Sequence, residues 1–493
     1  MNRTEILKLT LLAAVSAGLY AWLGAIGLGP ALLLFALFGR GLGTYIGNAL
    51  RADSGATGAM LAVLVLVVFC LQSPPAAVDD ALRDIASSAY GFDYHRLYAD
   101  ANLQHYNAYI GFDRALAWLG ALVGAEGTLH LVQASVMALF VLLLVLLAKK
   151  SNGTLSAEHY ALIALTLATP LSGRIFLARP EIVLTAWGCY AALVSRRWQL
   201  ALWLGAGAAL VPCYWLAALY FPFVLLLQVR LREKFLALAV LSVWHLVFWH
   251  VQSGGTYVES LHLLSAWPAN RAGPVLETES ILRLFLNLQF VALALLAGMA
   301  LSSTMREKRL GWREFNIAAL FFYFLASGMV RYSAAWSMLL FMVVVPWVGE
   351  NPVRNVWIRT GLLLFPVYCA AAIYNNVSPM SALPAFQYPA GSYVLTGMDA
   401  STYATPFFNP GKVRVAPSME LGANAKPVQL LAMGLDKGKL DCKALLAQPE
   451  HFTHVVENHL TTVPSCLRLL AVQGSWRQWA VVPDSASAGA GGQ

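Results

Sequence analysis

Long apolar runs separated by short polar segments make up most of this chain. Such runs lie near residues 8–28, 31–50, 57–71, 129–147, 159–177, 182–194, 235–250, 284–302, 315–330, 334–348 and 357–374. The stretch 198–228 is too long for one helix, and Pro212 near its middle predicts a hairpin of two short helices. For a hydrocarbon core about 30 Å thick, the pattern predicts a bundle of about thirteen membrane spans.

The first two runs leave alternatives open. Arg3 and Lys8 accompany the first run as in a signal peptide, but no convincing small-residue cleavage site follows, which favours an uncleaved anchor. The Gly29-Pro30 step and Arg40 are equally consistent with a re-entrant pair in place of two spans. Neither alternative changes the sidedness of the later runs.

Composition agrees with a polytopic membrane protein. Of 493 residues, 59% are hydrophobic and 12% are charged, and the mean hydropathy is +0.62. A soluble domain with a polar exterior cannot be built from this composition, so the lipid bilayer is one predicted partner. The formal net charge of +8 does not indicate a nucleic-acid partner, because no basic stripe with interleaved aromatic residues is present.

The basic residues predict which side of the membrane each loop occupies. The Lys and Arg residues at the ends of successive runs fall on one side of the bundle: Arg51, Lys149, Lys150, Arg196, Arg197, Arg230, Arg232, Lys234, Arg306, Lys308, Arg309, Arg313, Arg354 and Arg359. The positive-inside rule makes that side cytoplasmic. The chain is therefore predicted to be a multi-pass protein of the cytoplasmic (inner) membrane, with its N-terminus inside and its C-terminus in the periplasm.

This topology divides the chain into three parts. Residues 1–374 form the predicted transmembrane catalytic domain, with a first outward loop at about 72–126 and a second at about 251–283. Residues 375–482 form a small extracytoplasmic α/β domain, and 483–493 form a disordered tail. In the α/β domain, the segments GSYVLTG, KVRVA, PVQLLAM, THVVEN, LRLLAV and RQWAVV are predicted as strands, with a helix near 439–447. Cys442 and Cys466 share this domain and form either a disulfide or two free thiols.

An acid pair opens the first outward loop. Asp79 stands where an N-cap belongs, and Leu82, Ile85 and the alanines at 86 and 89 recur at helical spacing, which predicts a short amphipathic helix on the membrane surface. The helix macrodipole favours ionised carboxylates there, as a general base or metal ligand requires. Adjacent side chains diverge by about 100°, so one of Asp79 and Asp80 is predicted to act in catalysis and the other in structure.

A plainer interpretation of the same segment stays open. In it, Asp79 only caps the helix. Either Asp80 pairs with Arg83, or Asp84 is solvated. Arg83 in this segment and, downstream, His95 and His105 are candidate substrate contacts. The two histidines lie among several tyrosines, a composition typical of substrate sites and also of aromatic anchoring at the headgroup level. The stretch from Asp113 to 123 repeats the amphipathic pattern.

A second group of candidate residues lies at the outward end of a predicted helix pair. Arg174, Arg179 and Glu181 stand there, and a guanidinium suits phosphate oxygens. The alternative is an internal Arg179–Glu181 pair that orients the loop. Arg331, at another outward boundary, is a candidate phosphate contact or a snorkelling side chain.

The second loop supplies weaker candidates. Glu259 and His262, spaced i, i+3, are predicted to share one helix face. No Walker motif or dinucleotide glycine motif is present, and no CxxC or His-rich metal spacing. Hydrolysis of ATP and binding of NAD are therefore not expected.

The arrangement resembles the GT-C superfamily of integral-membrane glycosyltransferases. The resemblance is carried by the acid pair in the first outward loop, the flanking interfacial helices, the ARPE turn at 178–181 and the outward C-terminal domain. It implies a polyprenyl-phosphate-linked sugar donor, Asp79 or Asp80 as acceptor-activating base, and Arg179 with Glu181 near the donor phosphate. In many relatives the acidic motif follows the first membrane helix, whereas here it follows the third apolar run.

The predicted function is transfer of a hexosyl or pentosyl group from a polyprenyl-phosphate donor to an acceptor on the outer face of the membrane, with inversion. The acceptor is a glycan, lipid or protein. A divalent cation held by Asp79 or Asp80 is the one cofactor that such carboxylates would suit. Two other functions stay open: a transporter or flippase of a polyprenyl-linked sugar, and a non-catalytic subunit for envelope assembly.

Overall fold

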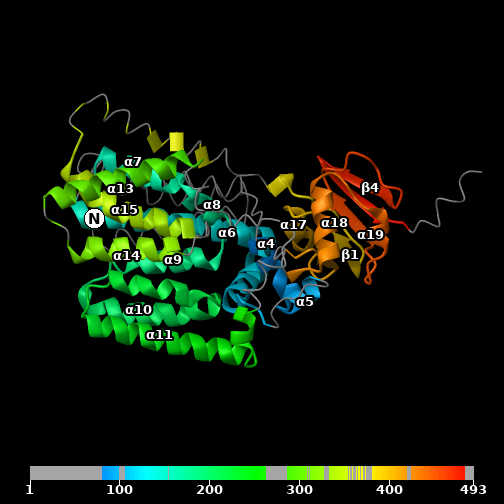
Figure 1. Cartoon of the computed structure of the whole chain (residues 1–493), viewed down its shortest axis with the longest axis horizontal. Helices are drawn as coiled ribbons and strands as arrows, with labels where there is room; N and C mark the ends of the chain where they lie inside the picture. The colour runs from blue at the N-terminus through cyan, green and yellow to red at the C-terminus, as the bar shows by residue number, and fades with distance from the viewer. Residues whose placement is uncertain are drawn as a thin grey trace, which may run out of the picture.

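The computed structural model describes residues 80–98, 106–153, 155–262, 286–307, 309, 311–326, 332–353, scattered positions between 355 and 373, 380–418 and 423–482. A helical bundle forms one end of the molecule, and a five-stranded sheet with its helices forms the other (Figure 1). Two short helices of the first predicted outward loop lie between them.

Within the described residues, the bundle is built from helices of very different length. They are α6 (Ile110–Asn152), α7 (Ala157–Ala168), α8 (Pro170–Phe176), α9 (Pro180–Tyr190), α10 (Arg196–Leu210), α11 (Leu231–Gln252), α13 (Leu288–Arg306), α14 (Trp312–Ala326) and α15 (Ser333–Glu350). Among them, α6, α11, α13 and α15 are long and apolar enough to cross a membrane. The three runs before residue 72 lie outside the described residues, so the number of thirteen spans stays a prediction.

Prolines and one glycine explain where the predicted runs break. The run 159–177, predicted as one span, is not one continuous helix: α7 ends at Ala168, and α8 begins at Pro170, whose ring is favourable in a first helical turn. That the run crosses the membrane once stays a prediction. The hairpin predicted around Pro212 is confirmed, since α10 ends at Leu210 and 3₁₀ helices η3 (Val211–Cys213) and η4 (Ala217–Leu226) follow. In α6, Gly124 has a φ of 78° and kinks the helix.

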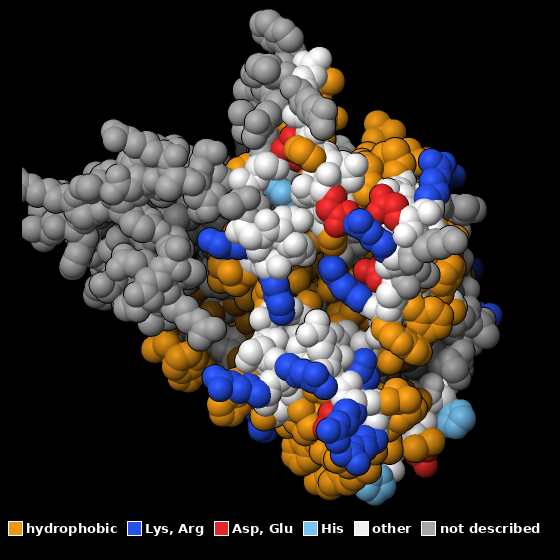
Figure 2. All heavy atoms as spheres, turned by 90° about the vertical axis from the view of Figure 1, so that its left-hand side faces the viewer, with side chains coloured by type: hydrophobic (Ala, Val, Ile, Leu, Met, Phe, Trp, Pro, Cys, Tyr) orange, Lys and Arg blue, Asp and Glu red, His pale blue; other side chains and the backbone are white. Residues whose placement is uncertain are grey.

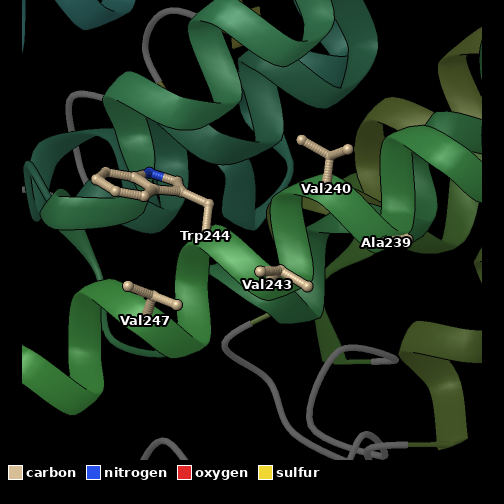
Figure 3. Close-up of a pocket in the computed structure, with 5 residues that line it drawn as sticks. All are labelled: Ala239, Val240, Val243, Trp244 and Val247. Atoms are coloured by element: carbon tan, nitrogen blue, oxygen red, sulfur yellow. The ribbon is translucent and has the colours of Figure 1, made fainter.

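The outward face of α11 shows why this bundle requires lipid. Ala237, Leu241, His245 and Trp249 recur every four residues and are buried. The opposite side carries Val240, Val243 and Val247, which are 46%, 61% and 52% exposed. With Trp244 and Ala239 they line a shallow, wholly apolar groove of about 410 Å³ (Figure 3). A helix with an apolar exterior of this extent is stable when hydrocarbon covers it.

The sheet has the strand order β2-β1-β3-β5-β4. Its strands are β1 (Ser392–Leu395), β2 (Val413–Ala416), β3 (His454–Glu457), β4 (Leu467–Gln473) and β5 (Trp476–Val481). Parallel pairing joins β1 to β2 and β3, and antiparallel pairing joins β3 to β5 and β5 to β4. Five of the six predicted strand segments are therefore confirmed.

The sixth segment, PVQLLAM, is not a strand but part of helix α18 (Lys426–Asp436). Val428, Leu431, Ala432 and Leu435 have helical spacing and are all buried. Val428, Leu431 and Leu435 pack with β1 residues in one apolar cluster. Pro427 stands in the first turn, where its missing N–H has no cost. The helix predicted near 439–447 is α19, which is shorter than predicted (Cys442–Leu446).

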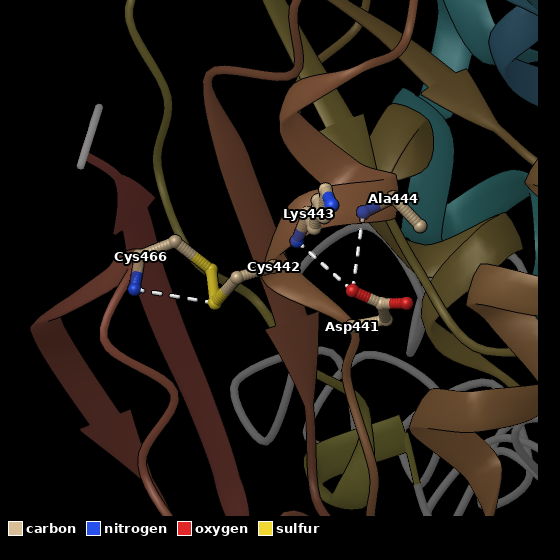
Figure 4. The surroundings of a disulfide bond; sticks show 5 residues. All are labelled: Asp441, Cys442, Lys443, Ala444 and Cys466. Carbon is tan, nitrogen blue, oxygen red and sulfur yellow. Dashed lines mark hydrogen bonds between the residues drawn. A yellow bond between two sulfur atoms is a disulfide. The ribbon is translucent and has the colours of Figure 1, made fainter.

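Cys442 and Cys466 form a disulfide, with their Cα atoms 5.6 Å apart (Figure 4). The Asp441 carboxylate accepts hydrogen bonds from the backbone N–H groups of Lys443 and Ala444 and so caps α19 beside the disulfide. The bond ties α19 to the start of β4.

The first predicted outward loop joins the bundle to the sheet. It contains α4 (Asp80–Ala86), η2 (Ser87–Tyr90) and α5 (Tyr94–Leu97), and further along the chain α17 (Ser401–Phe408) packs against α4. The hydroxyl of Tyr90 donates to the backbone oxygen of Val413, 2.8 Å away, and Tyr98 forms a parallel bridge with Val415. The loop and β2 are thus directly bonded.

The opposite end of the bundle is basic. Figure 2 faces this end, and Lys and Arg side chains crowd its described part. The C-terminal end of α6 and the N-terminal ends of α11 and α14 meet here, bringing Lys150, Lys234 and Arg313 together. These residues were predicted to share one side, and they do. Assignment of that side to the cytoplasm stays a prediction.

Candidate active site beside the sheet domain

Helix α4 begins at Asp80, one residue after the predicted N-cap. Asp79 and the Asp80 side chain lie outside what the structure describes, so the roles assigned to both stay predictions. What the structure does describe is how the rest of α4 is held. Residues 81–86 are all buried, which makes the prediction of a helix lying on the membrane surface wrong. The physical reason is that both α6 and α17 pack against α4.

Arg83 and Asp84 form a buried ion pair on α4. The Nε and Nη2 atoms of Arg83 donate to Oδ1 of Asp84 at 3.0 and 2.9 Å. The plainer interpretation of this segment predicts a solvated Asp84. This prediction is wrong, because the Asp84 side chain is fully buried. The Arg83 guanidinium also lies over the rings of Tyr94 and Tyr109, 4.7 and 5.4 Å from their centroids, a favourable cation–π geometry.

Tyr94 connects this ion pair to a second buried carboxylate. Its hydroxyl oxygen is 3.1 Å from Oδ1 of Asp84 and 2.9 Å from Oδ2 of Asp113, and the Asn107 amide donates to the same Asp113 oxygen at 2.7 Å. A phenol has one hydrogen and can fully serve one carboxylate at a time. The hydroxyl of Tyr94 can therefore donate its hydrogen bond to either Asp84 or Asp113.

The electrostatics keep Tyr94 neutral. Burial raises the pKa of the Tyr94 hydroxyl well above its ordinary value, and the nearby charges of Asp113 and Asp84 raise it further, while Arg83 lowers it. The hydroxyl thus stays a donor throughout the physiological range. We call Arg83, Asp84, Tyr94, Asn107 and Asp113 the acid cluster.

Asp113 was not among the predicted site residues, although its position in the sequence carries a signal. Asp113 lies three residues after Ile110 and three before Leu116, and all three are buried. A carboxylate on the apolar stripe of a helix has to be stabilised by hydrogen bonds or charge. Its position among apolar neighbours was therefore the clue.

Arg174, Arg179 and Glu181 come together at the turn between α8 and α9. Nη2 of Arg174 donates to Oε1 of Glu181 at 2.6 Å, and Nη1 of Arg179 is 3.6 Å from the same oxygen. All three side chains are 10% exposed or less. Ala178, in the turn between the two arginines, has a φ of 48°, an unfavourable backbone conformation for alanine. We call these three residues the arginine cluster.

The arginine cluster agrees with the internal-pair alternative as far as its contacts go. Glu181 stands in the first turn of α9, as predicted from Pro180. Whether the two guanidinium groups also contact a donor phosphate stays a prediction.

An apolar cluster and a series of aromatic rings connect the acid cluster with the arginine cluster. Ala178 belongs to the same buried apolar cluster as Ala81, Leu82 and Ile85 of α4. The ring of Tyr109 stacks on Tyr214, with centroids 5.6 Å apart. Both clusters therefore lie at one end of the bundle, around α4.

Close backbone packing fixes the aromatic part of this connection. The backbone N–H of Trp215 donates to the Ala108 oxygen at 2.9 Å. A Cβ atom at Gly111 would lie 2.9 Å from backbone and side-chain atoms of Pro212, so only glycine fits. Tyr220 follows in η4, within electrostatic reach of Arg174 and Glu181.

The other predicted site residues are placed less centrally. His95 is half-buried in α5, next to Asp93, whose carboxylate caps that helix. Glu259 and His262 lie on the helical stretch 257–262, and both are exposed, as one shared face predicts. They belong to neither buried cluster. His105 and Arg331 lie outside the described residues.

Metal binding stays untested. Within the ranges that the structure describes, no three or more His, Cys, Asp and Glu side chains are grouped to hold a metal ion. The two carboxylates to which a cation was assigned, Asp79 and Asp80, are not among the side chains described.

Together, the fold and the two buried clusters define a helical membrane protein that carries a small α/β domain. A scan against protein-family models finds no match, and a search of curated proteins finds none either. Among solved structures, the chain is similar to the oligosaccharyltransferase of Archaeoglobus fulgidus, crystallised with an acceptor peptide containing the NVT sequon tethered by a disulfide bond. The similarity covers 83% of this chain and 70% of that chain, at 12% identity and a TM-score of 0.46.

That solved protein is named as an oligosaccharyltransferase. At such a TM-score the likeness carries no argument about function. The proposal below rests on this chain's own residues.

Proposed function

We propose that this protein is a membrane glycosyltransferase. It transfers a sugar from a polyprenyl-phosphate donor to an acceptor at the outer face of the cytoplasmic membrane. The observation that carries the proposal is the position of α4. This helix starts with an acidic residue, is fixed by the acid cluster, and shares an apolar cluster with the turn that holds Arg174 and Arg179. Such a transfer needs two chemical functions: a carboxylate as the base and guanidinium groups to stabilise the phosphate.

The chemistry follows from these two functions. The carboxylate of Asp79 or Asp80 takes the proton of an acceptor hydroxyl. The acceptor oxygen forms a bond to the anomeric carbon as the bond from that carbon to the phosphate oxygen breaks, and the electron pair leaves with the phosphate. Arg174 and Arg179 stabilise the charge that develops on the phosphate. Displacement from the opposite face inverts the anomeric centre.

Burial explains why the acid cluster is not itself the base. Asp84 and Asp113 have no exposed surface, so an acceptor hydroxyl cannot reach them without rearrangement. Their role is positional: an ion pair and a shared hydroxyl fix the orientation of α4 and thereby of its first residue. In a buried site, an ion pair and its hydrogen bonds restrict motion more than apolar packing alone does.

Separate substitutions of the acid pair test the proposal. Asp79→Asn and Asp80→Asn are made one at a time, and sugar transfer is measured in membranes supplied with a polyprenyl-phosphate-linked sugar. One variant is expected to lose at least about 100-fold in rate, the usual contribution of a general base. Asp93→Asn is the matched control, because this partly exposed acid lies in the same loop and asparagine also caps a helix.

Two other results would each contradict the proposal. Equal transfer by both variants and the wild type would show that neither acid is the base. Loss of envelope glycan on deletion of 375–482, with the acid-pair variants silent, would instead indicate a non-catalytic assembly subunit. Mass analysis of envelope glycans with and without the protein identifies the sugar and the acceptor.

A further inference from the structure

A cavity opens at the basic end of the bundle, opposite the candidate active site. Its volume is about 770 Å³, and it lies between the ends of α6, α11 and α14 and the segment 225–229. Three cationic side chains line it, one from each helix: Lys150, Lys234 and Arg313. Among the described residues that line it, none is acidic. The cavity therefore concentrates positive charge in an enclosed space.

Backbone carbonyl groups hold the three cations at the cavity. The Lys150 ammonium donates to the Ala192 oxygen, that of Lys234 donates to the Leu225 oxygen at 2.8 Å, and Nη2 of Arg313 donates to the Met342 oxygen at 3.0 Å. An ammonium has three donors and a guanidinium five, so one carbonyl leaves further N–H groups on each. The charges of Lys150 and Arg313 also repel each other. An anion between them would relieve that repulsion and accept the remaining hydrogens.

Ser151, Gln228 and Asn316 add polar groups to the lining, and its other residues are apolar and continue to the surface. Leu147, Leu226 and Met342 form part of it, and Leu231 and Trp312 extend it outward. Leu231 is 63% exposed and Trp312 is 81% exposed. A tryptophan in such a position is typical of the boundary between headgroups and hydrocarbon. The cavity thus offers cations in its interior and an apolar surface at its mouth, which suits a ligand with an anionic head and a hydrocarbon tail better than a free ion.

We propose that this cavity binds the phosphate-bearing headgroup of an anionic phospholipid. The phosphodiester lies among Lys150, Lys234 and Arg313, and the acyl chains run along Leu231 and Trp312. Basic pockets between membrane helices bind such headgroups by this combination of charge and apolar contact. The inference requires only that the bundle spans a membrane, so it stands or falls independently of glycosyl transfer.

Native mass spectrometry of the full-length protein in detergent tests this inference. Phosphatidylglycerol, phosphatidylcholine and inorganic phosphate are added in turn. One phosphatidylglycerol is expected to remain bound per protein, phosphatidylcholine is not, and inorganic phosphate does not displace the bound lipid. Lys150→Ala, Lys234→Ala and Arg313→Ala should each weaken binding roughly fivefold, since one cation near a lipid surface contributes about 1 kcal/mol. Lys149→Ala is the matched control, because Lys149 is adjacent and equally charged but does not line the cavity.

Several results would overturn the inference. Equal retention of phosphatidylcholine by the wild type would do so without any variant, even if the substituted proteins failed to fold. Displacement by inorganic phosphate would reassign the cavity to a free anion, and tighter binding of a polyprenyl phosphate would reassign it to a lipid of another class. Unchanged lipid binding in a variant that combines Lys150→Ala, Lys234→Ala and Arg313→Ala would show that these cations do not bind the lipid.

Discussion

The two ends of the helix bundle contain the same charged residue types in opposite surroundings. Beside the sheet domain, Arg83 pairs with Asp84 and Arg174 with Glu181, and these side chains are 10% exposed or less. At the basic end, Arg309 contacts Glu307 with both side chains about half-exposed or more. Lys and Arg predominate on the described part of that face (Figure 2).

The surroundings determine what each set of charges does. A buried ion pair carries a desolvation cost that its hydrogen bonds must offset, and it holds only in one geometry. It therefore fixes the position of α4 and of the turn at Ala178. Exposed cations are screened and contribute little to stability, but they set the orientation of the helices in the membrane and attract anionic lipid. The charges beside the sheet domain fix the positions of neighbouring elements, and those at the basic end orient the bundle in the membrane.

Removing one partner of the buried pair should give the largest effect on stability. Arg83→Met leaves the Asp84 carboxylate buried with its ion pair broken, and the expected loss is about 3–5 kcal/mol. Arg196→Met is the control at the basic end, where the side chain is exposed, and should change stability by less than about 0.5 kcal/mol. Thermal unfolding in detergent measures both.

A double substitution sharpens this comparison. Arg83→Met combined with Asp84→Leu removes both charges, so it should be less destabilising than Arg83→Met alone. Equal losses in Arg83→Met and Arg196→Met would show that the two ends do not differ in the way described. Equal losses in the single and double variants would show that the ion pair is not the cause.

The disulfide should give the next largest effect, confined to the sheet domain. Cys442 and Cys466 are 24 residues apart in sequence, and a cross-link across such a loop stabilises by about 2–4 kcal/mol. Cys442→Ser with Cys466→Ser should therefore lower the unfolding temperature of the sheet domain. Addition of reductant should destabilise the wild type and leave the double variant unchanged; an effect on both would assign the loss to something other than this bond.

Sequence patterns predicted the elements better than they predicted their surroundings. The break at Pro212, five of the six strand segments and Glu181 in the first turn of α9 all follow from local chemistry: proline, β-branched residues and capping. The burial of α4 does not, because it depends on α17, more than 300 residues away in sequence. The same reason explains why Asp84 was considered solvated, since no local pattern shows which face another segment covers.

The bond between the first loop and the sheet should have a moderate effect. Burial raises the pKa of Tyr90 to about 12, so its hydroxyl stays a neutral donor to the Val413 oxygen, 2.8 Å away. Tyr90→Phe leaves that buried oxygen without this donor and should cost about 1 kcal/mol. Tyr323→Phe, on the partly exposed face of α14, is the control. If Tyr90→Phe were as stable as the wild type by thermal unfolding, the loop would not be anchored to β2 by this bond.

The smallest predicted effect is a pH dependence of the sheet domain. Burial raises the pKa of the Asp399 carboxyl, while hydrogen bonds from Ser401 lower it in part. Burial also raises the pKa of Asp436, with repulsion from Asp399 contributing. The folded state then binds more protons than the unfolded state between an unfolded pKa of about 3.9 and the raised value. Stability from these two groups is therefore highest at low pH and falls as pH rises through that window.

Asp399→Asn separates the contribution of Asp399 to this pH dependence from the contributions of the other titrating groups. The amide oxygen of asparagine can still accept from the backbone N–H of Ser401, 2.8 Å away, but it cannot ionise. The variant should therefore gain stability relative to the wild type as pH rises from about 4 to 7, in thermal unfolding measured on both proteins across that range. A constant difference between the two would show that Asp399 titrates as it does in the unfolded chain. Its burial beside Asp436 would then have no electrostatic consequence.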